Sequence, residues 1–147
     1  MLSTPEVLRR TGGKPVKSIV FDEATIAARV ESLAMEITEA YPTGELLVLG
    51  LLKGSFIFLS DLVRKIERPI QVDFLVASSY GDAKVSSGRV RLLYDPETRL
   101  EGKHILLVED IIDTGKTLQR LMALLGERRP GSLAICALLD KELAADP

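Results

Sequence analysis

Residues 104–118 of the chain read HILLVEDIIDTGKTL, and this stretch decides the fold class. Its first part, His104–Val108, is a short apolar run typical of a strand that is covered on both faces. Two acids follow at once, a third comes after two isoleucines, and a small, hydroxyl-rich turn then opens a helix predicted over Lys116–Glu127. A buried strand that passes through a polar turn into a helix is the repeating unit of α/β proteins.

The same alternation of strands and helices runs along most of the chain. Residues 1–15 are expected to form a loose arm, and residues 16–147 a single core domain. Asp22 is expected to cap a helix whose apolar residues recur at helical spacing: Ile26, Val30, Leu33, Ala34 and Ile37. A second helix should begin after Gly54 and Ser55. The other predicted elements are strands at Val16–Phe21, Leu46–Leu52, Ile70–Ala77, Val90–Tyr94 and Ser132–Leu139, and a loop at Ser78–Gly88. This order implies a Rossmann-like parallel sheet with flanking helices and right-handed crossovers.

The composition excludes several classes of protein. The 147 residues suffice for one α/β domain, and a net charge of −2, from 19 basic and 21 acidic residues, argues against a nucleic-acid partner. The sequence contains no apolar stretch long enough for a signal peptide or a membrane span. A single cysteine, Cys136, excludes an internal disulfide and fits a reducing compartment, so a cytoplasmic location is expected.

The turn that follows His104–Val108 carries residues suited to a phosphate group. Thr114, Gly115 and Thr117 can offer hydroxyls and closely approaching N–H groups at the start of a helix, and Lys116 can add positive charge. The segment resembles the end of a nucleoside-triphosphate P-loop, but that motif requires glycine at position 110, which is aspartate here. The P-loop interpretation therefore fails.

Three acids lie beside this predicted phosphate site: Glu109, Asp110 and Asp113. They would repel a phosphate unless ribose hydroxyls and a divalent ion such as Mg²⁺ lay between. The alternative is that the acids merely cap a helix and line a solvated turn. A single acid would fit that alternative, whereas an acid-rich turn at the carboxyl end of a strand favours a binding site.

Other polar residues allow two interpretations each. Lys53, in the turn after Leu46–Leu52, is either an anchor for phosphate oxygens or a solvated lysine. Lys141 follows the last predicted strand, where solvation is the simpler interpretation. His104, the only histidine, enters its strand from the amino end, away from the acids, so a structural role is expected.

The stretch Val108–Leu118 resembles the phosphoribosyl-pyrophosphate motif of type I phosphoribosyltransferases. Its acidic-apolar-apolar-Asp-Thr-Gly form is similar to that of the hypoxanthine-guanine branch, and the resemblance extends from about Ile19 to Lys141. It implies purine salvage: transfer of the 5-phosphoribosyl group from phosphoribosyl pyrophosphate to hypoxanthine or guanine, with Mg²⁺ as cofactor. It also implies a homodimer or homotetramer.

The resemblance implies a role for each candidate residue. Residues 114–117 would hold the 5-phosphate, Glu109 and Asp110 the ribose hydroxyls and the metal, and Asp113 would accept or steer the purine proton. The other implied roles are pyrophosphate binding by Lys53 and Gly54 after a cis Leu52–Lys53 peptide, the start of a lid at Ser79 and Tyr80, and a bond from Lys141 to the purine oxygen.

One departure from the family is expected. Similar enzymes continue for a few tens of residues into a small hood with an aromatic residue that stacks on the purine. The segment from Glu142 to Pro147 contains no aromatic residue and no arginine, so we expect this chain to lack the hood. Two alternatives therefore stand beside the active enzyme: a noncatalytic or regulatory phosphoribosyl- or nucleotide-binding module, and a phosphoribosyltransferase for xanthine or a pyrimidine.

Overall fold

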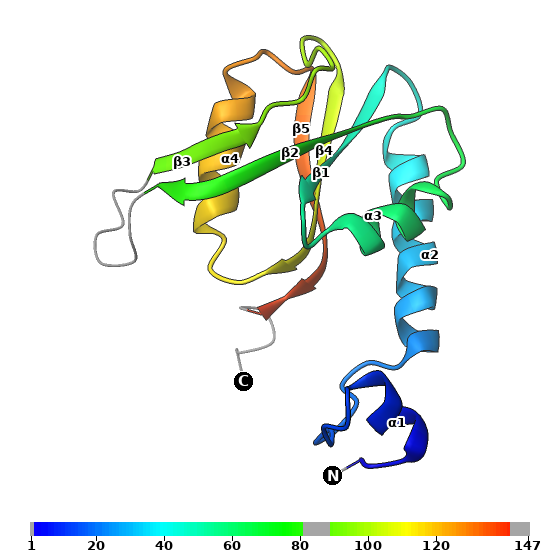
Figure 1. The fold of residues 1–147 in the computed structure, drawn as a ribbon. Helices are drawn as coiled ribbons and strands as arrows, with labels where there is room; N and C mark the ends of the chain where they lie inside the picture. Colours follow the sequence, from blue (N-terminus) through cyan, green and yellow to red (C-terminus); the bar gives the residue numbers. More distant parts are fainter. Residues whose placement is uncertain (1, 81–88, 142–147) are drawn as a thin grey trace.

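A five-stranded sheet in the order β3-β2-β1-β4-β5 forms the centre of the protein (Figure 1). The computed structural model describes residues 2–80 and 89–141. β1 pairs in parallel with β2 and β4, β4 pairs in parallel with β5, and β3 pairs antiparallel with β2. The strands are β1 (Leu46–Leu52), β2 (Gln71–Tyr80), β3 (Arg89–Tyr94), β4 (His104–Ile112) and β5 (Ser132–Asp140). The helices are α1 (Pro5–Arg10), α2 (Glu23–Ala40), α3 (Phe56–Val63) and α4 (Lys116–Gly126).

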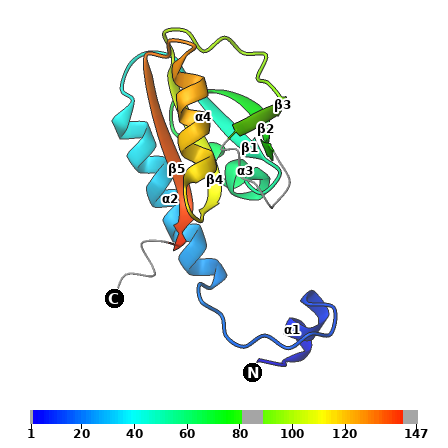
Figure 2. The same cartoon turned by 90° about the vertical axis from the view of Figure 1, so that its left-hand side faces the viewer.

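Helices cover both faces of the sheet and divide the core into two clusters (Figure 1, Figure 2). Leu46 and Val48 of β1 pack in the cluster formed with α2 and α3, whereas Leu47 and Leu49 pack in the cluster formed with α4. All four side chains are buried. A central strand covered on both faces explains why β1 reads as a continuous apolar run, and it confirms the predicted α/β architecture.

The predicted cap of α2 is confirmed. The N–H of Thr25 donates to Asp22 Oδ1 at 2.8 Å, and hydrogen bonds from the side chain and the N–H of Thr25 lower the pKa of Asp22. The buried stripe of α2 consists of Val30, Leu33, Ala34 and Ile37, whereas Ile26 is 39% exposed and lies outside the core. Within residues 2–80 and 89–141, no helix combines the length and apolar character needed to cross a membrane.

The predicted strand at Val16–Phe21 is wrong. Val16 forms only an isolated bridge with Leu2, and Ile19, Val20 and Phe21 are exposed. A strand needs a neighbour to pair with, and Figure 1 shows this segment beyond the end of α2, away from the sheet. Within the predicted loose arm, α1 forms a short helix whose first turn is capped by the Thr4 side chain.

The predicted loop at Ser78–Gly88 is wrong in its first residues, because β2 continues to Tyr80. The expectation of parallel strands also fails at β3, which returns beside β2 as the second strand of a ribbon. Too few residues separate Tyr80 from Arg89 for a crossover helix, and a short connection joins antiparallel strands only. Residues 81–88 of the predicted loop lie outside the described residues.

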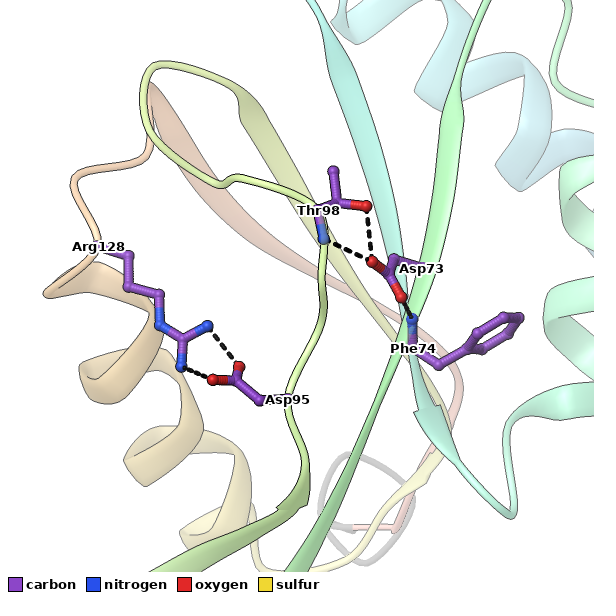
Figure 3. A network of polar contacts seen from close by, with 5 residues as sticks. All are labelled: Asp73, Phe74, Asp95, Thr98 and Arg128. Carbon is purple, nitrogen blue, oxygen red and sulfur yellow. Dashed lines mark hydrogen bonds and ion pairs between the residues drawn. The ribbon is translucent and has the colours of Figure 1, made fainter.

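Two polar contacts, one around the buried Asp73 and one at the surface, hold the segment between β3 and β4 in place (Figure 3). Asp73, only 9% exposed on β2, accepts from the hydroxyl of Thr98 at 2.6 Å and from its N–H at 2.9 Å. Burial alone would raise the pKa of Asp73, but the hydrogen bonds outweigh burial, so the pKa is lowered. Arg128, just beyond α4, binds both carboxylate oxygens of Asp95 at 2.5 and 2.9 Å. These contacts join the segment between β3 and β4, which we call the crossover, to β2 and to the end of α4.

Candidate functional site

Two loops meet at the carboxyl ends of β1 and β4. The turn Lys53–Ser55 follows β1, and the turn 113–115 follows β4. Because the two strands are parallel neighbours, their loops lie side by side. Gly54 lies against Asp110 so closely that a Cβ on the glycine would come 3.2 Å from Asp110 Oδ1. The Leu52–Lys53 peptide bond is cis, as predicted.

A hollow of about 240 Å³ opens at the turn after β4. It is lined by Leu51, Glu109, Ile111, Ile112, Asp113, Thr114, Gly115, Thr117 and Leu118. The structure therefore brings two of the predicted acids, Glu109 and Asp113, together with the hydroxyl residues that the sequence singles out, whereas Asp110 faces Gly54. The lysines predicted to assist them, Lys53, Lys116 and Lys141, are exposed side chains.

The hydroxyl-rich turn opens directly into α4. Gly115 is the N-cap residue and has a φ of +76°, a left-handed conformation that glycine adopts without steric cost. As glycine has no side chain, the cap itself leaves the first N–H groups of the helix for another acceptor. The N–H of Lys116 donates to Thr114 Oγ1 at 3.4 Å, and Thr117 lines the hollow. A helix N-terminus of this form suits a phosphate group.

Glu109 and Asp110 form a half-buried acidic pair at the end of β4. The N–H of Asp110 donates to Glu109 Oε1 at 2.9 Å, and the N–H of Ile111 donates to Asp110 Oδ1 at 2.8 Å. Burial raises the pKa of Glu109 to about 7, and the neighbouring Asp110 carboxylate acts in the same direction. A nearby cation would offset both effects, so the pair suits a metal ion better than a bare anion.

The acidic pair makes up only part of a metal-binding shell. Across the described ranges, no group of three or more histidine, cysteine or acidic side chains could hold a metal ion. Mg²⁺ does not need such a group, since it usually keeps several waters and is held by one or two carboxylates together with substrate oxygens. The residues present therefore fit Mg²⁺ bound jointly with a phosphorylated ligand.

Asp113 and Lys141 approach each other beside the ends of β4 and β5. Lys141 Nζ lies 4.0 Å from Asp113 Oδ2, and both side chains are exposed. The pairing of β4 with β5 brings them together, because Ile112 stands opposite Asp140 in the register. A carboxylate that accepts and an ammonium that donates are thus presented side by side.

Ser79 and Tyr80 lie farther along the sheet than the other predicted site residues. The pairing of β2 with β1 ends at Leu52–Val76, so both residues belong to the part of β2 that pairs with β3 alone. Their predicted role at the start of a lid involves residues 81–88, which lie outside the described residues. That role stays a prediction.

Comparison with known proteins identifies the family. The profile of the phosphoribosyl transferase domain matches residues 16–146. The chain belongs to the phosphoribosyl transferase family. Hypoxanthine phosphoribosyltransferase of Salmonella typhimurium is 45% identical over 130 residues, which cover 87% of this chain and 73% of that enzyme. Hypoxanthine-guanine phosphoribosyltransferase of Dictyostelium discoideum is 45% identical over 130 residues, covering 86% and 72%. A crystal structure of hypoxanthine-guanine phosphoribosyltransferase from Bacillus anthracis superposes with a TM-score of 0.80 and 38% identity, covering 86% and 75%.

Two residues of the candidate site were not predicted from the sequence. Ile111, between Asp110 and Asp113, and Leu51 of β1 both line the hollow. The side chain of Ile111 is 40% exposed. The signal for Ile111 was its place in the sequence, where an apolar residue directly follows the acidic pair and continues β4. Its side chain adds exposed apolar surface beside the polar groups of the hollow.

His104 lies away from the candidate site, as predicted. It begins β4 at the end opposite to the acids, where its Nδ1 lies 2.6 Å from Ser132 Oγ. Its ring is tilted against Tyr41, with 5.2 Å between the ring centroids. A larger surface hollow of about 770 Å³ contains none of the predicted site residues; it is lined by Arg10 and by residues of α2, of α3 and of the turn just after α3.

Proposed function

We propose that the protein is a hypoxanthine-guanine phosphoribosyltransferase acting in purine salvage. The reaction transfers the 5-phosphoribosyl group from phosphoribosyl pyrophosphate to hypoxanthine or guanine and yields IMP or GMP and pyrophosphate. One observation carries the proposal: a helix N-terminus shares one hollow with the carboxylates of Glu109 and Asp113. The chain is 45% identical to a hypoxanthine phosphoribosyltransferase and to a hypoxanthine-guanine phosphoribosyltransferase.

The sugar phosphate would bind across the two loops. Its 5-phosphate would accept from the N–H groups and hydroxyls of the turn 114–117, with Lys116 nearby. Its pyrophosphate would lie at Lys53 and Gly54, on the β1 side of Asp110. This orientation is supported by geometry, because it gives both phosphate ends of the ligand positively polarised partners and leaves the ribose opposite the acids.

Glu109 and Asp110 would face the ribose hydroxyls and hold Mg²⁺ as the cofactor. The ion supplies charge neutralisation that makes pyrophosphate a better leaving group. The chain contributes the orientation of the two carboxylates, which the hydrogen bonds from the main chain of residues 110 and 111 fix in place.

Asp113 and Lys141 would act on the base. The purine nitrogen forms its bond to the anomeric carbon as the bond from that carbon to the pyrophosphate oxygen breaks. The proton lost from the purine ring passes to Asp113, or is steered by it, while Lys141 donates to the exocyclic oxygen. A lysine has donors and no acceptor, so it favours 6-oxopurines over adenine.

We further propose a homodimer or homotetramer acting in the cytoplasm without a nucleic-acid or membrane partner. Phe56 and Ile57, adjacent residues at the start of α3, are 56% and 59% exposed, and apolar side chains of this size often mark contacts between subunits. Sedimentation equilibrium of the chain tests the assembly.

The proposal is tested by pyrophosphate release from phosphoribosyl pyrophosphate and Mg²⁺ with hypoxanthine, guanine, xanthine or adenine as acceptor. Turnover with hypoxanthine or guanine supports the enzyme. Turnover confined to xanthine would show that the base is xanthine and would contradict the proposed preference for hypoxanthine or guanine. Binding of the sugar phosphate in calorimetry without turnover on any base would contradict catalysis and favour a binding module.

A further inference from the structure

The turn between β1 and α3 contains one residue that differs sharply from its neighbours. Lys53 and Gly54 are exposed, whereas the side chain of Ser55 is completely buried, at 0% exposure. A hydroxyl removed from water in this way needs a partner inside the protein. The partner shows what the serine does.

Ser55 stands at the N-cap of α3 but does not cap the helix. Its backbone is helical, with φ −80° and ψ −8°, and its side chain makes no capping hydrogen bond. Instead, its hydroxyl donates to the carbonyl oxygen of Leu51 at 2.6 Å. This bond reaches back over Leu52, Lys53 and Gly54 and closes the turn from the inside.

The main chain fixes the other side of the same turn. The N–H of Phe56 donates to the carbonyl of Lys53 at 3.2 Å, and the N–H of Leu59 donates to the carbonyl of Ser55 at 2.7 Å. The registered pairing of β1 with β4 ends at Gly50–Val108, one residue before Leu51. The Ser55 hydroxyl thus joins the end of the strand to the start of the helix where pairing with β4 stops.

The position of this turn affects the acidic pair, because Gly54 of the turn contacts Asp110. Gly54 lies against the Asp110 carboxylate, with its missing Cβ position 3.2 and 3.3 Å from the two oxygens. A small movement of the turn would either press on Asp110 or draw Lys53 and Gly54 away from it. A buried hydrogen bond between Leu51 and Ser55 limits both movements.

We infer that Ser55 is a positioning residue for the pyrophosphate-binding turn. It touches no substrate and acts by holding Lys53 and Gly54 at a fixed distance from the acidic pair. The inference rests on the proposed function and deepens it, because it assigns the pyrophosphate part of the ligand to a turn whose shape depends on one buried hydroxyl.

Calorimetric binding to the full chain with Mg²⁺ tests this inference. We expect Ser55→Ala to weaken the binding of phosphoribosyl pyrophosphate and of pyrophosphate by roughly 5- to 30-fold, the effect of one lost buried hydrogen bond. Ribose 5-phosphate, which lacks the pyrophosphate, should bind equally well to wild type and variant, because it uses the turn 114–117. A loss of general stability would not separate the two kinds of ligand.

Two further variants serve as controls. Ser60→Ala removes a hydroxyl from the exposed side of α3 and should bind all three ligands as the wild type does. Ser55→Cys keeps the shape and a weaker donor, so its affinity for pyrophosphate should fall between those of wild type and Ser55→Ala. If Ser55→Ala does not fold, the cysteine variant decides by the same comparison of ligands.

The outcomes separate this inference from the proposed function. If the wild type binds all three ligands and Ser55→Ala binds them equally tightly, the role of Ser55 is overturned and the proposed function stands. Equal weakening of ribose 5-phosphate and pyrophosphate would also overturn the positioning role. A wild type that binds none of the three ligands would overturn both.

Discussion

Lys141 Nζ lies 4.0 Å from Asp113 Oδ2, and the two residues directly follow the carboxyl ends of β5 and β4. The ion pair is exposed, so separating it to admit a ligand costs little. A donor and an acceptor held side by side match a base edge that carries an oxygen next to a ring nitrogen. The pair therefore supports the assignment of the base to this side of the turn.

Asp113→Asn should retain Mg²⁺–phosphoribosyl pyrophosphate binding and lower the turnover rate by about 100-fold or more, the usual contribution of a general base. The amide keeps the shape of the side chain but cannot take a proton. Steady-state kinetics with hypoxanthine and calorimetry with the sugar phosphate measure the two effects separately. Unchanged turnover would remove Asp113 from the mechanism.

The double variant Glu109→Ala with Asp110→Ala should weaken Mg²⁺-dependent binding of phosphoribosyl pyrophosphate by about tenfold or more, because the metal loses its protein ligands. The binding should also lose its dependence on Mg²⁺ concentration. Glu97→Ala, which alters an acid between β3 and β4, provides the control. Equal Mg²⁺ dependence in wild type and double variant would contradict the role assigned to the acidic pair.

Glu109→Gln should stabilise the metal-free protein more at about pH 8 than at about pH 5. The folded-state pKa of Glu109, about 7, lies above its ordinary value of 4.5, so the folded protein holds this proton more tightly than the unfolded chain does. The stability that the group contributes is complete below the ordinary value and is lost as the pH rises through 7. Glutamine stays neutral throughout and avoids that loss.

Thermal denaturation in EDTA at the two pH values measures this effect. Glu127→Gln, at the exposed end of α4, is the matched control and should follow the wild type. A gain for Glu109→Gln that is equal at both pH values would show that titration of Glu109 is not its cause. A stabilised variant that binds Mg²⁺ poorly would show that the acidic pair is kept for function at a cost in stability.

Much of the site could be predicted because it is local in sequence. The stretch from His104 to Leu118 contains a strand, its acids, a turn and the start of a helix, and the structure has β4, the turn and α4 in that order. The cap of α2 at Asp22 was predictable for the same reason, since donor and acceptor lie three residues apart.

The errors arose where structure depends on a distant partner. The run Val16–Phe21 has the composition of a strand, but whether it pairs is decided by residues elsewhere, and it has only the Leu2–Val16 bridge. The contact of Gly54 with Asp110 and the burial of Ser55 are likewise tertiary facts. The sequence places Ser55 at the start of a helix, and the structure shows that its hydroxyl donates to the Leu51 carbonyl and not to the helix.

Arg129→Gly should raise the free energy of unfolding by about 0.5–1 kcal/mol. Arg129 has a φ of +56°, a left-handed conformation that is unfavourable for a residue with a Cβ and free of that cost for glycine. Gly102→Ala is the reverse experiment: its φ is +75° and no atom lies within 4 Å of an added Cβ, so only the backbone conformation is penalised. Urea denaturation of both variants should give opposite signs, and a destabilised Arg129→Gly would show that its side chain outweighs the strain.

Asp73→Asn should lower the free energy of unfolding by about 1–3 kcal/mol at neutral pH, because a buried acceptor loses the charge that its donors stabilise. The folded-state pKa of Asp73 is lowered, so its contribution is present above the ordinary value of 3.8 and is lost as the pH falls through the folded value. The difference between wild type and variant should therefore shrink under strongly acidic conditions.

Chemical denaturation at neutral pH and at about pH 3 measures this difference, with Asp95→Asn as the control on the same crossover (Figure 3). The Asp95 side chain is 56% exposed in its ion pair with Arg128, so its loss should cost less than about 1 kcal/mol. An Asp95 variant as unstable as the Asp73 variant would mean that the tie to α4, rather than the buried tie to β2, holds the crossover in place.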